Sequence, residues 1–115
     1  MIHTNCRNLE LAESQVEGAR GVRLNRVISQ ETGAPNFALR LFAIEPSGHT
    51  PRHHHEWEHE IYIRKGTGRV FLGGEERSLE EGDVLFIPGG LEHQFLNDGE
   101  NDLEFLCMVP HSAQY

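Results

Sequence analysis

Eight of the 115 residues are histidines, and five of these fall between positions 49 and 59. Histidine is the commonest metal-binding side chain, so a cluster this dense points first to a metal site. Successive side chains of an extended chain point to opposite faces, which places His53 and His55 on one side and His54 on the other. Two imidazoles at positions i and i+2 can reach the same ion. Such a pair alone is also typical of a solvated histidine-rich loop.

The next predicted strand offers a choice of third ligand between His59 and Glu60. If His59 faces the interior, Ile61 and Ile63 face inward with it. If Glu60 faces inward instead, Arg64 must be buried with it, and burying an unpaired charge is costly. We therefore predict that His59 is the ligand. Glu60 is then a surface carboxylate, or an acceptor behind a ligand.

His93 is the fourth candidate, on a strand where it shares a face with Phe95 and Asn97. A lone histidine in such a place is more often a core residue satisfied by a hydrogen bond than a metal ligand. The residues around it change that judgement, because they follow a known spacing.

That spacing resembles the second motif of the cupin superfamily. The motif is glycine, five residues, proline, one residue, glycine, two residues, histidine, three residues and asparagine. It is met at every position by Gly82, Pro88, Gly90, His93 and Asn97. The resemblance therefore gives His93 the role of a ligand.

The first cupin motif is also present, with two departures. His53, His55 and Gly66 stand at the expected spacing, while the leading glycine is Gly48, one place late. His59 occupies the position where most cupins carry glutamate. Together with the run from residue 34 to residue 68, this makes the chain similar to the small four-histidine manganese cupins of thermophilic bacteria.

The resemblance implies an all-β fold, a single-domain cupin in which a double-stranded β-helix, or jelly-roll barrel, encloses one divalent metal ion. The implied ligands are His53, His55, His59 and His93. Manganese is favoured by the resemblance, but imidazole also suits iron, nickel, copper and zinc. Four protein ligands leave up to two positions of an octahedral ion open for substrate or dioxygen.

The rest of the sequence is consistent with such a barrel. Twelve glycines and five prolines divide it into short strands, a pattern typical of β-sandwiches and barrels. We predict strands over residues 21–29, 37–45, 59–65, 69–72, 75–79, 84–87, 92–97 and 102–109. Residues 21–115 are interpreted as the barrel and residues 1–20 as an N-terminal arm. Within the arm, residues 9–16 fit either a helical turn or a segment that reaches over a neighbouring subunit.

Three further residues are candidates for lining the pocket. Phe105 and Cys107 share a face of the last strand, although a buried free cysteine usually serves as a small apolar filler. Arg40 interrupts an apolar strand; its two-pronged donor could bind a substrate carboxylate, or it could pair with one of the many acidic side chains. No catalytic residue is assigned. The remaining histidines are predicted to be surface residues: His3, His49, His54 and His111.

Composition excludes several classes of partner. Lys and Arg total 10 and Asp and Glu total 18, a formal charge of −8 that repels phosphate backbones and anionic lipids. No apolar run approaches the roughly 20 residues of a transmembrane helix. The N-terminus lacks the pattern of a signal peptide, so we expect a cytoplasmic protein. Cys6 and Cys107 form no disulfide pattern and are expected as thiols.

The leading functional hypothesis is an oxygenase-type enzyme that acts on a small organic molecule at this metal centre. Alternatives are a metal-assisted isomerase or lyase and a non-catalytic binding or sensing module. We also expect a homodimer, because residues 21–29 form a strand with apolar residues on both faces, and an edge strand invites pairing with a second chain.

Overall fold

The computed structural model describes residues 1–113, and within them the chain forms nine β-strands and two short 3₁₀-helices. The strands are β1 Ala12–Glu13, β2 Arg20–Ile28, β3 Phe37–His49, β4 His59–Lys65, β5 Gly68–Leu72, β6 Glu75–Leu79, β7 Val84–Ile87, β8 His93–Leu96 and β9 Leu103–Pro110. The 3₁₀-helices are η1 Cys6–Asn8 and η2 Gln30–Thr32. Every strand predicted from the sequence is present, and β3 continues four residues beyond its predicted end at residue 45.

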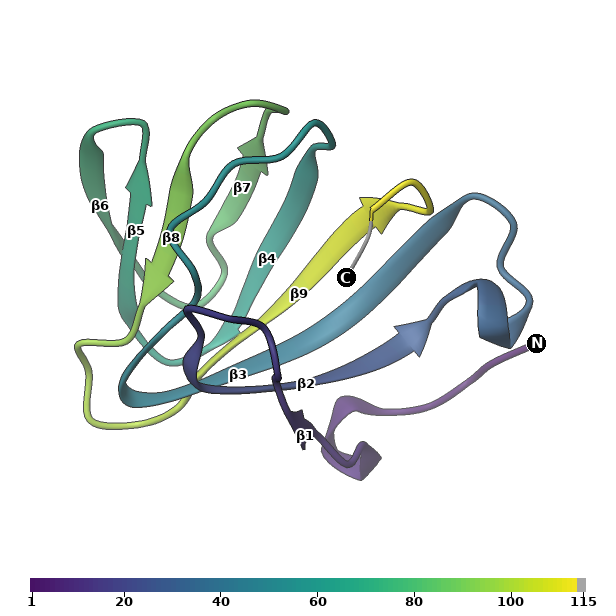
Figure 1. Ribbon diagram of the computed structural model, residues 1–115. Helices are drawn as coiled ribbons and strands as arrows, with labels where there is room; N and C mark the ends of the chain where they lie inside the picture. Colours follow the sequence, from purple (N-terminus) through teal and green to yellow (C-terminus); the bar gives the residue numbers. More distant parts are fainter. Residues whose placement is uncertain (114–115) are drawn as a thin grey trace.

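The strands form one strongly curled sheet in the order β6-β5-β8-β3-β9-β4-β7, with β2 paired to the other edge of β3 and β1 paired to β2. All pairings are antiparallel among the described residues. Figure 1 shows the strands curled around a common interior, with the segment between β3 and β4 crossing over it. The predicted all-β fold, a sheet curled into a barrel, is confirmed.

The apolar side chains of β4 decide which face of the strand is buried. His59, Ile61 and Ile63 are buried, while Glu60 and Tyr62 are exposed. The side chains alternate with period two, so the buried set lies on the inner face of the curl. Glu60 is therefore an outward-facing carboxylate, as the cost of burying Arg64 predicts.

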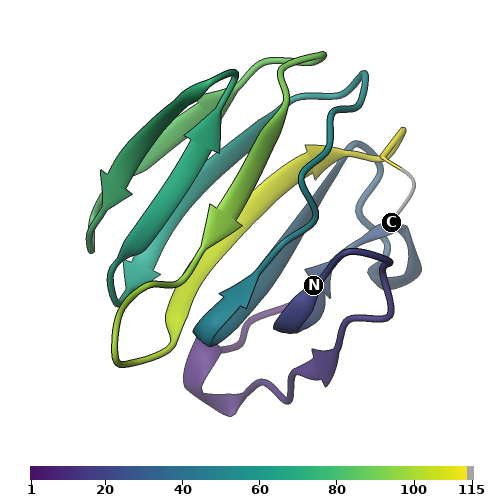
Figure 2. The same cartoon turned by 60° about the vertical axis from the view of Figure 1, so that its left-hand side comes forward.

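The N-terminal arm has no helical turn over residues 9–16, which corrects one of the two readings of this segment. Ala12 pairs with Leu24 and Glu13 with Arg23, so the arm adds a short strand to β2 of the same chain. The Asn25 side chain donates to the Glu10 carbonyl at 2.8 Å and holds the arm further. Figure 2 shows the arm running beside β2, across the molecule from β6. By pairing with β2, the arm satisfies backbone hydrogen-bonding groups along the edge of that strand. This gain exceeds the weak helical preference of so short a segment.

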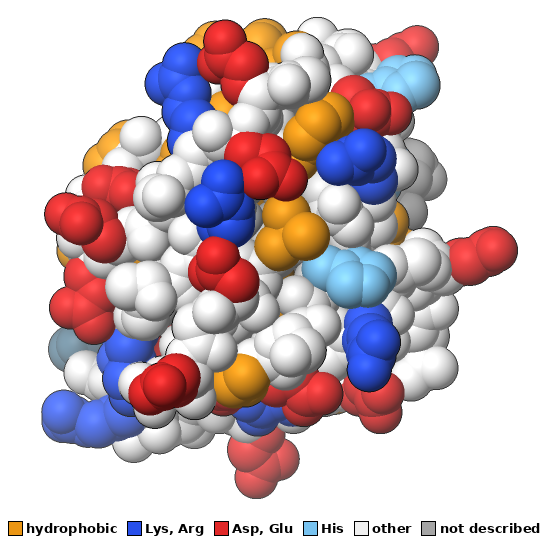
Figure 3. All heavy atoms as spheres, turned by 90° about the vertical axis from the view of Figure 1, so that its left-hand side faces the viewer, with side chains coloured by type: hydrophobic (Ala, Val, Ile, Leu, Met, Phe, Trp, Pro, Cys, Tyr) orange, Lys and Arg blue, Asp and Glu red, His pale blue; other side chains and the backbone are white. Residues whose placement is uncertain are grey.

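Acidic and basic side chains are interspersed on the surface. Ion pairs join Arg69 to Glu76 and Arg77 to Glu75 at 2.9 and 3.2 Å. On the face drawn in Figure 3, acidic and basic side chains alternate and the apolar areas between them are small and separate. No helix in residues 1–113 has the length and apolar character needed to cross a membrane.

Candidate metal centre

His53 and His93 are placed side by side by a short antiparallel bridge. The His53 N–H donates to the His93 carbonyl at 3.2 Å, and the His93 N–H donates to the His53 carbonyl at 2.9 Å. Residues directly opposite in an antiparallel pair send their side chains to the same face. The backbone therefore brings the crossing segment after β3 and the start of β8 together with both imidazoles facing inward.

His55 is held by the glycine turn that precedes β8. The Gly90 N–H donates to the His55 carbonyl at 2.7 Å. At Gly89 a Cβ atom would lie 2.1 Å from the Glu56 carbonyl oxygen, so a residue with a side chain would push the two segments apart. The turn thus fixes the backbone that carries the second histidine, and the motif glycine within it, Gly90, has a φ of 84° that favours glycine.

His59 opens β4 and points inward beneath the crossing segment. Its Nε2 atom lies 2.8 Å from Nε2 of His55, and its Nδ1 atom lies 3.0 Å from the Cys107 sulfur. Its ring centroid is 4.6 Å from that of His55 and 5.2 Å from that of His93. The side chain is buried, so its Nε2 atom meets His55 in the interior of the curl.

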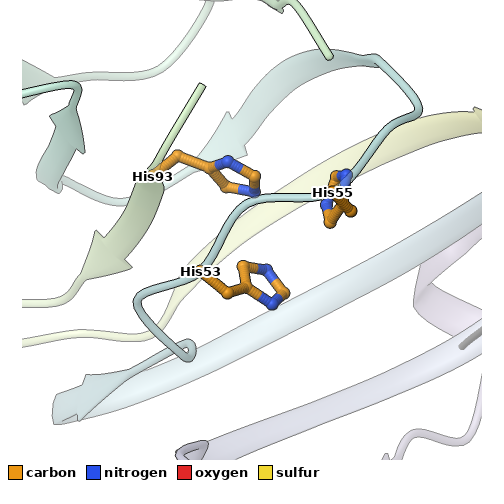
Figure 4. Close-up of side chains that lie close together, drawn as sticks. All are labelled: His53, His55 and His93. Carbon is orange, nitrogen blue, oxygen red and sulfur yellow. The ribbon is translucent and has the colours of Figure 1, made fainter. Parts of the chain in front are cut away.

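The four sequence-predicted ligands are therefore brought together. His53, His55 and His93 each offer a ring nitrogen, and these three atoms lie within 4.8 Å of one another. Figure 4 shows the three rings converging from the crossing segment and from β8. His59 joins them through its contact with His55.

Backbone carbonyls orient two of the rings. Nδ1 of His55 lies 2.9 Å from the Trp57 carbonyl oxygen, and Nδ1 of His93 lies 2.8 Å from that of Leu91. A carbonyl only accepts, so each Nδ1 must carry the proton and each Nε2 presents a lone pair to the interior. The indole of Trp57 stacks on the His55 ring with centroids 4.3 Å apart and restrains that ring as well.

The surroundings keep these histidines neutral. Burial lowers the pKa of His59 to about 2 and that of His53 to about 4, with the neighbouring imidazoles adding to both shifts. Burial likewise lowers the pKa of His55 and of His93. Metal binding requires neutral imidazole, so at neutral pH the ligand set is already in its binding form.

The donor set fits a divalent transition metal. Two imidazole nitrogens bound at about 2.1 Å to adjacent positions of one ion lie about 3 Å apart, close to the 2.8 Å between Nε2 of His55 and Nε2 of His59. Carbonyl acceptors behind the ring nitrogens are the usual support of metal-binding histidines. The spacing of His55 and His59, and the carbonyl support of His55 and His93, are those of metal ligands.

A cavity of about 450 Å³ opens from the histidines into the barrel. Arg40, Phe105 and Cys107, the residues predicted as pocket candidates, all lie in its wall. Arg40 is buried and donates to the Cys107 sulfur at 3.2 Å. Burial raises the pKa of the Cys107 thiol, and the charge of Arg40 opposes that rise. Phe105 stacks between the rings of Phe42 and Phe95 at 5.1 and 4.7 Å.

Sequence reasoning missed part of this wall. The N-terminal arm, predicted to be separate from the barrel, contributes residues 12–16 and Ala19 to the cavity wall. Its alternating polar and small residues carry no signal of such a role.

Two of the four histidines predicted at the surface, His49 and His111, are half-buried, whereas His3 and His54 are exposed. Nδ1 of His49 lies 3.1 Å from the Thr50 carbonyl oxygen, and Nε2 of His111 contacts that of Ala34.

Comparison with known proteins identifies the family. Residues 40–109 match the cupin domain family. The chain belongs to this family. An oxalate-binding protein of Thermotoga maritima is 33% identical over 111 residues, which cover 90% of this cupin and 90% of that protein. A 1-methylthio-D-xylulose 5-phosphate methylsulfurylase of Rhodospirillum rubrum is 37% identical over 71 residues, or 62% of this cupin and 46% of the length of the enzyme.

Solved structures share the fold. The polyketide cyclase RemF from Streptomyces resistomycificus superposes with a TM-score of 0.90 at 31% identity, covering 96% of this cupin and 80% of RemF. A predicted oxalate decarboxylase from Thermotoga maritima superposes with a TM-score of 0.82 at 27% identity, covering 95% of this cupin and 98% of that chain. The names of these relatives differ in chemistry, because one fold hosts many activities.

Proposed function

We propose that this cupin is a metal-dependent, oxygenase-type enzyme that acts on a small organic molecule. The proposed metal ligands are His53, His55, His59 and His93. The observation that carries the proposal is the convergence of these imidazoles, three of which, His53, His59 and His93, line a cavity of about 450 Å³, a volume within the roughly 300–1,000 Å³ typical of small-molecule sites. Four protein ligands would leave positions of an octahedral ion facing that cavity.

The proposed cofactor is one divalent transition metal ion, with manganese favoured and iron, nickel, copper or zinc as alternatives. When bound, the ion would supply open coordination positions and redox chemistry. The residues of the chain have separate tasks. The carbonyls of Trp57 and Leu91 orient the imidazoles, and the aromatic side chains of Phe42 and Phe105 form an apolar wall that excludes water from the reacting molecule.

A metal-assisted isomerase or lyase is the second candidate. Such a reaction needs a base near the ion, and Glu60 does not supply it because its side chain is exposed on the outer face of β4. Glu13 of the arm lies in the cavity wall and is the carboxylate that supports this candidate. RemF, named as a cyclase, adds support from a relative. A non-catalytic binding role is supported by the relative named as an oxalate-binding protein.

The test begins with protein purified without added metal. Elemental analysis and electron paramagnetic resonance should find close to one redox-active ion per chain. Small carboxylic acids, oxalate and 1,3-diketones should then be incubated with the loaded protein, with and without dioxygen. Turnover coupled to oxygen uptake supports the oxygenase. Product formation of equal rate without oxygen indicates the isomerase or lyase, and binding without any product indicates the non-catalytic role.

We also propose that the protein is a homodimer. β1 pairs with Leu24 and Arg23 of β2, and the remaining outer edge of β2 up to Ile28 has no strand beside it within residues 1–113. An exposed edge of this kind favours pairing with a second chain. Light scattering at micromolar concentration should give about twice the chain mass of 13.1 kDa. A mass near 13.1 kDa would exclude the dimer.

A further inference from the structure

Arg40 is a fully charged side chain in the interior of the barrel. It is 1% exposed, its guanidinium lies 5.0 Å from the centroid of the Phe42 ring, and it donates to the thiol of Cys107. Its register fixes this position, because Arg40 pairs directly with Cys107 of β9, and Cys107 pairs with Ile61 of β4. The three side chains form an inward row next to His59.

A second arginine stands beside Arg40 because β2 is irregular there. Asn25 pairs with Leu41 and Ile28 with Leu39, so two residues of β2, Arg26 and Val27, face the single residue Arg40. Such a bulge bends the strand and redirects its side chains. Arg26 and Arg40 line both the 450 Å³ cavity and a second hollow of about 250 Å³. The two cationic groups therefore lie where the hollows meet.

The buried charge in the wall of the cavity is positive, because it belongs to Arg40, although the whole chain carries −8. The carboxylates among the residues that line the two hollows, Glu13 and Glu31, are both exposed, whereas Arg40 is buried. Its charge reaches the histidines: after burial and neighbouring histidines, Arg40 is a further cause of the lowered pKa of His59. A metal ion on neutral imidazoles would add two positive charges to the same space.

We propose that Arg40 is the anchor for an anionic group of the substrate, and that this cupin takes monocarboxylates with an apolar body. The planar guanidinium matches a carboxylate through two parallel hydrogen bonds. Leu24, Phe42 and Phe105 supply apolar surface for the rest of the molecule. Arg26, exposed at the meeting of the two hollows, attracts the anion before it is buried. This proposal deepens the proposed function and rests on the same cavity, but the anchor itself needs no metal.

The test measures binding to the metal-free full-length protein, so that it is independent of any activity at the ion. Benzoate and its neutral counterpart benzamide are titrated and followed by nuclear magnetic resonance. Benzoate should bind at least about ten-fold more tightly than benzamide and more tightly than oxalate, which has no apolar body. Arg40→Gln should remove the preference for benzoate, whereas Arg40→Lys should keep part of it because the charge remains without the fork. Arg26→Gln should weaken benzoate less than Arg40→Gln.

Arg23→Gln is the matched control, since Arg23 lies on the outer face of β2 paired with Asp102 at 2.8 Å, and benzoate affinity should stay within about two-fold. Thermal unfolding and metal loading of each variant establish that the barrel is intact. If Arg40→Gln and Arg40→Lys both load metal and bind benzoate like the parent protein, the proposal is wrong. Equal binding of benzoate and benzamide by the parent protein, or tighter binding of oxalate, also overturns it. If instead the protein fails to bind metal, the proposed function falls while this result stands.

Discussion

The two ends of the barrel interior are built by the same strands from opposite kinds of residue. At one end, aliphatic side chains from four different strands are packed to complete burial, among them Ile44, Ile63, Val70 and Leu103 at 0% exposure. At the other end, histidines, Arg40 and Cys107 surround a cavity. The difference shows that position along a strand, rather than choice of strand, separates the core from the site.

Strands β4 and β9 show this division residue by residue. The inner face of β4 begins with His59 and ends with Ile63, and the inner face of β9 begins with Leu103 and reaches Cys107 four residues later. A close-packed end holds the strands in register, and that register places the polar groups of the other end. Substitutions at the two ends should therefore have separable effects on stability and on metal binding.

The largest effect is expected from removing a ligand. His59→Ala should lower metal affinity by more than about 100-fold, beyond the roughly 10–100-fold that partners behind the ligands cost, because one of four imidazoles is lost. Alanine at His53, His55 or His93 should act similarly. Equilibrium dialysis against a competing chelator measures the change.

Glu60→Ala provides the control on the neighbouring residue. Its side chain is exposed on the outer face of the strand, so metal affinity should change little. The ligand assignment would be wrong if Glu60→Ala lost metal while His59→Ala retained it.

A large effect on stability is expected at the closed end. Leu103→Ala removes a fully buried side chain and should reduce the free energy of unfolding by about 2–5 kcal/mol. The matched control Val84→Ala, at a side chain that is 78% exposed, should cost less than about 0.5 kcal/mol. Urea unfolding of the metal-free protein measures both. Loss of metal from folded Leu103→Ala would show that the two ends are not separable.

Much of this division can be predicted from the sequence, because side chains alternate strictly between the two faces of a strand. The choice of His59 over Glu60 needed no more than the cost of burying Arg64, and the structure has His59 buried and Glu60 exposed. The spacing from Gly82 to Asn97 placed His93 on an inner face. Its last residue has a structural task, since the buried Asn97 amide donates to the Ile44 and Asn101 carbonyls at 2.7 and 2.8 Å.

The sequence could not predict features that depend on contacts between distant segments. The bulge that places Arg26 beside Arg40 arises from the pairing of β2 with β3, and neither strand carries a local signal of it. The arm was open to two readings because a two-residue strand has no periodicity to detect. Its contribution to the cavity wall follows from the edge of β2 that it joins.

Acid should affect the histidine end selectively. The pKa of His53 is about 4 in the folded protein and near 6.5 in the unfolded chain. Between these two pH values the unfolded chain therefore binds more protons than the folded protein. The free energy of unfolding should therefore fall as the pH drops from 6.5 towards 4, with His59 extending the loss to lower pH. Leu103→Ala should lower the whole curve without changing its slope. Urea unfolding at a series of pH values measures both.

Protons should also compete with the ion in the loaded protein. Each ligating imidazole must lose its proton to bind, so release of metal on acidification should take up more than one proton per ion. A dependence on one proton or fewer would mean that fewer histidines bind than the four assigned.

The smallest effect is expected behind His59, where the Cys107 sulfur lies 3.0 Å from Nδ1. If this contact orients the ring, Cys107→Ala should lower metal affinity by about 10-fold, the lower limit for a partner behind a ligand. Cys107→Ser, which keeps a hydrogen-bonding group, should recover part of the loss. Val109→Ala is the control, because Val109 is buried two residues further along the same face of β9. This substitution removes apolar volume alone. Competition with a chelator measures all three variants. Equal metal affinity in Cys107→Ala and the parent protein would show that Cys107 is a small apolar filler. The histidines alone would then define this end of the barrel.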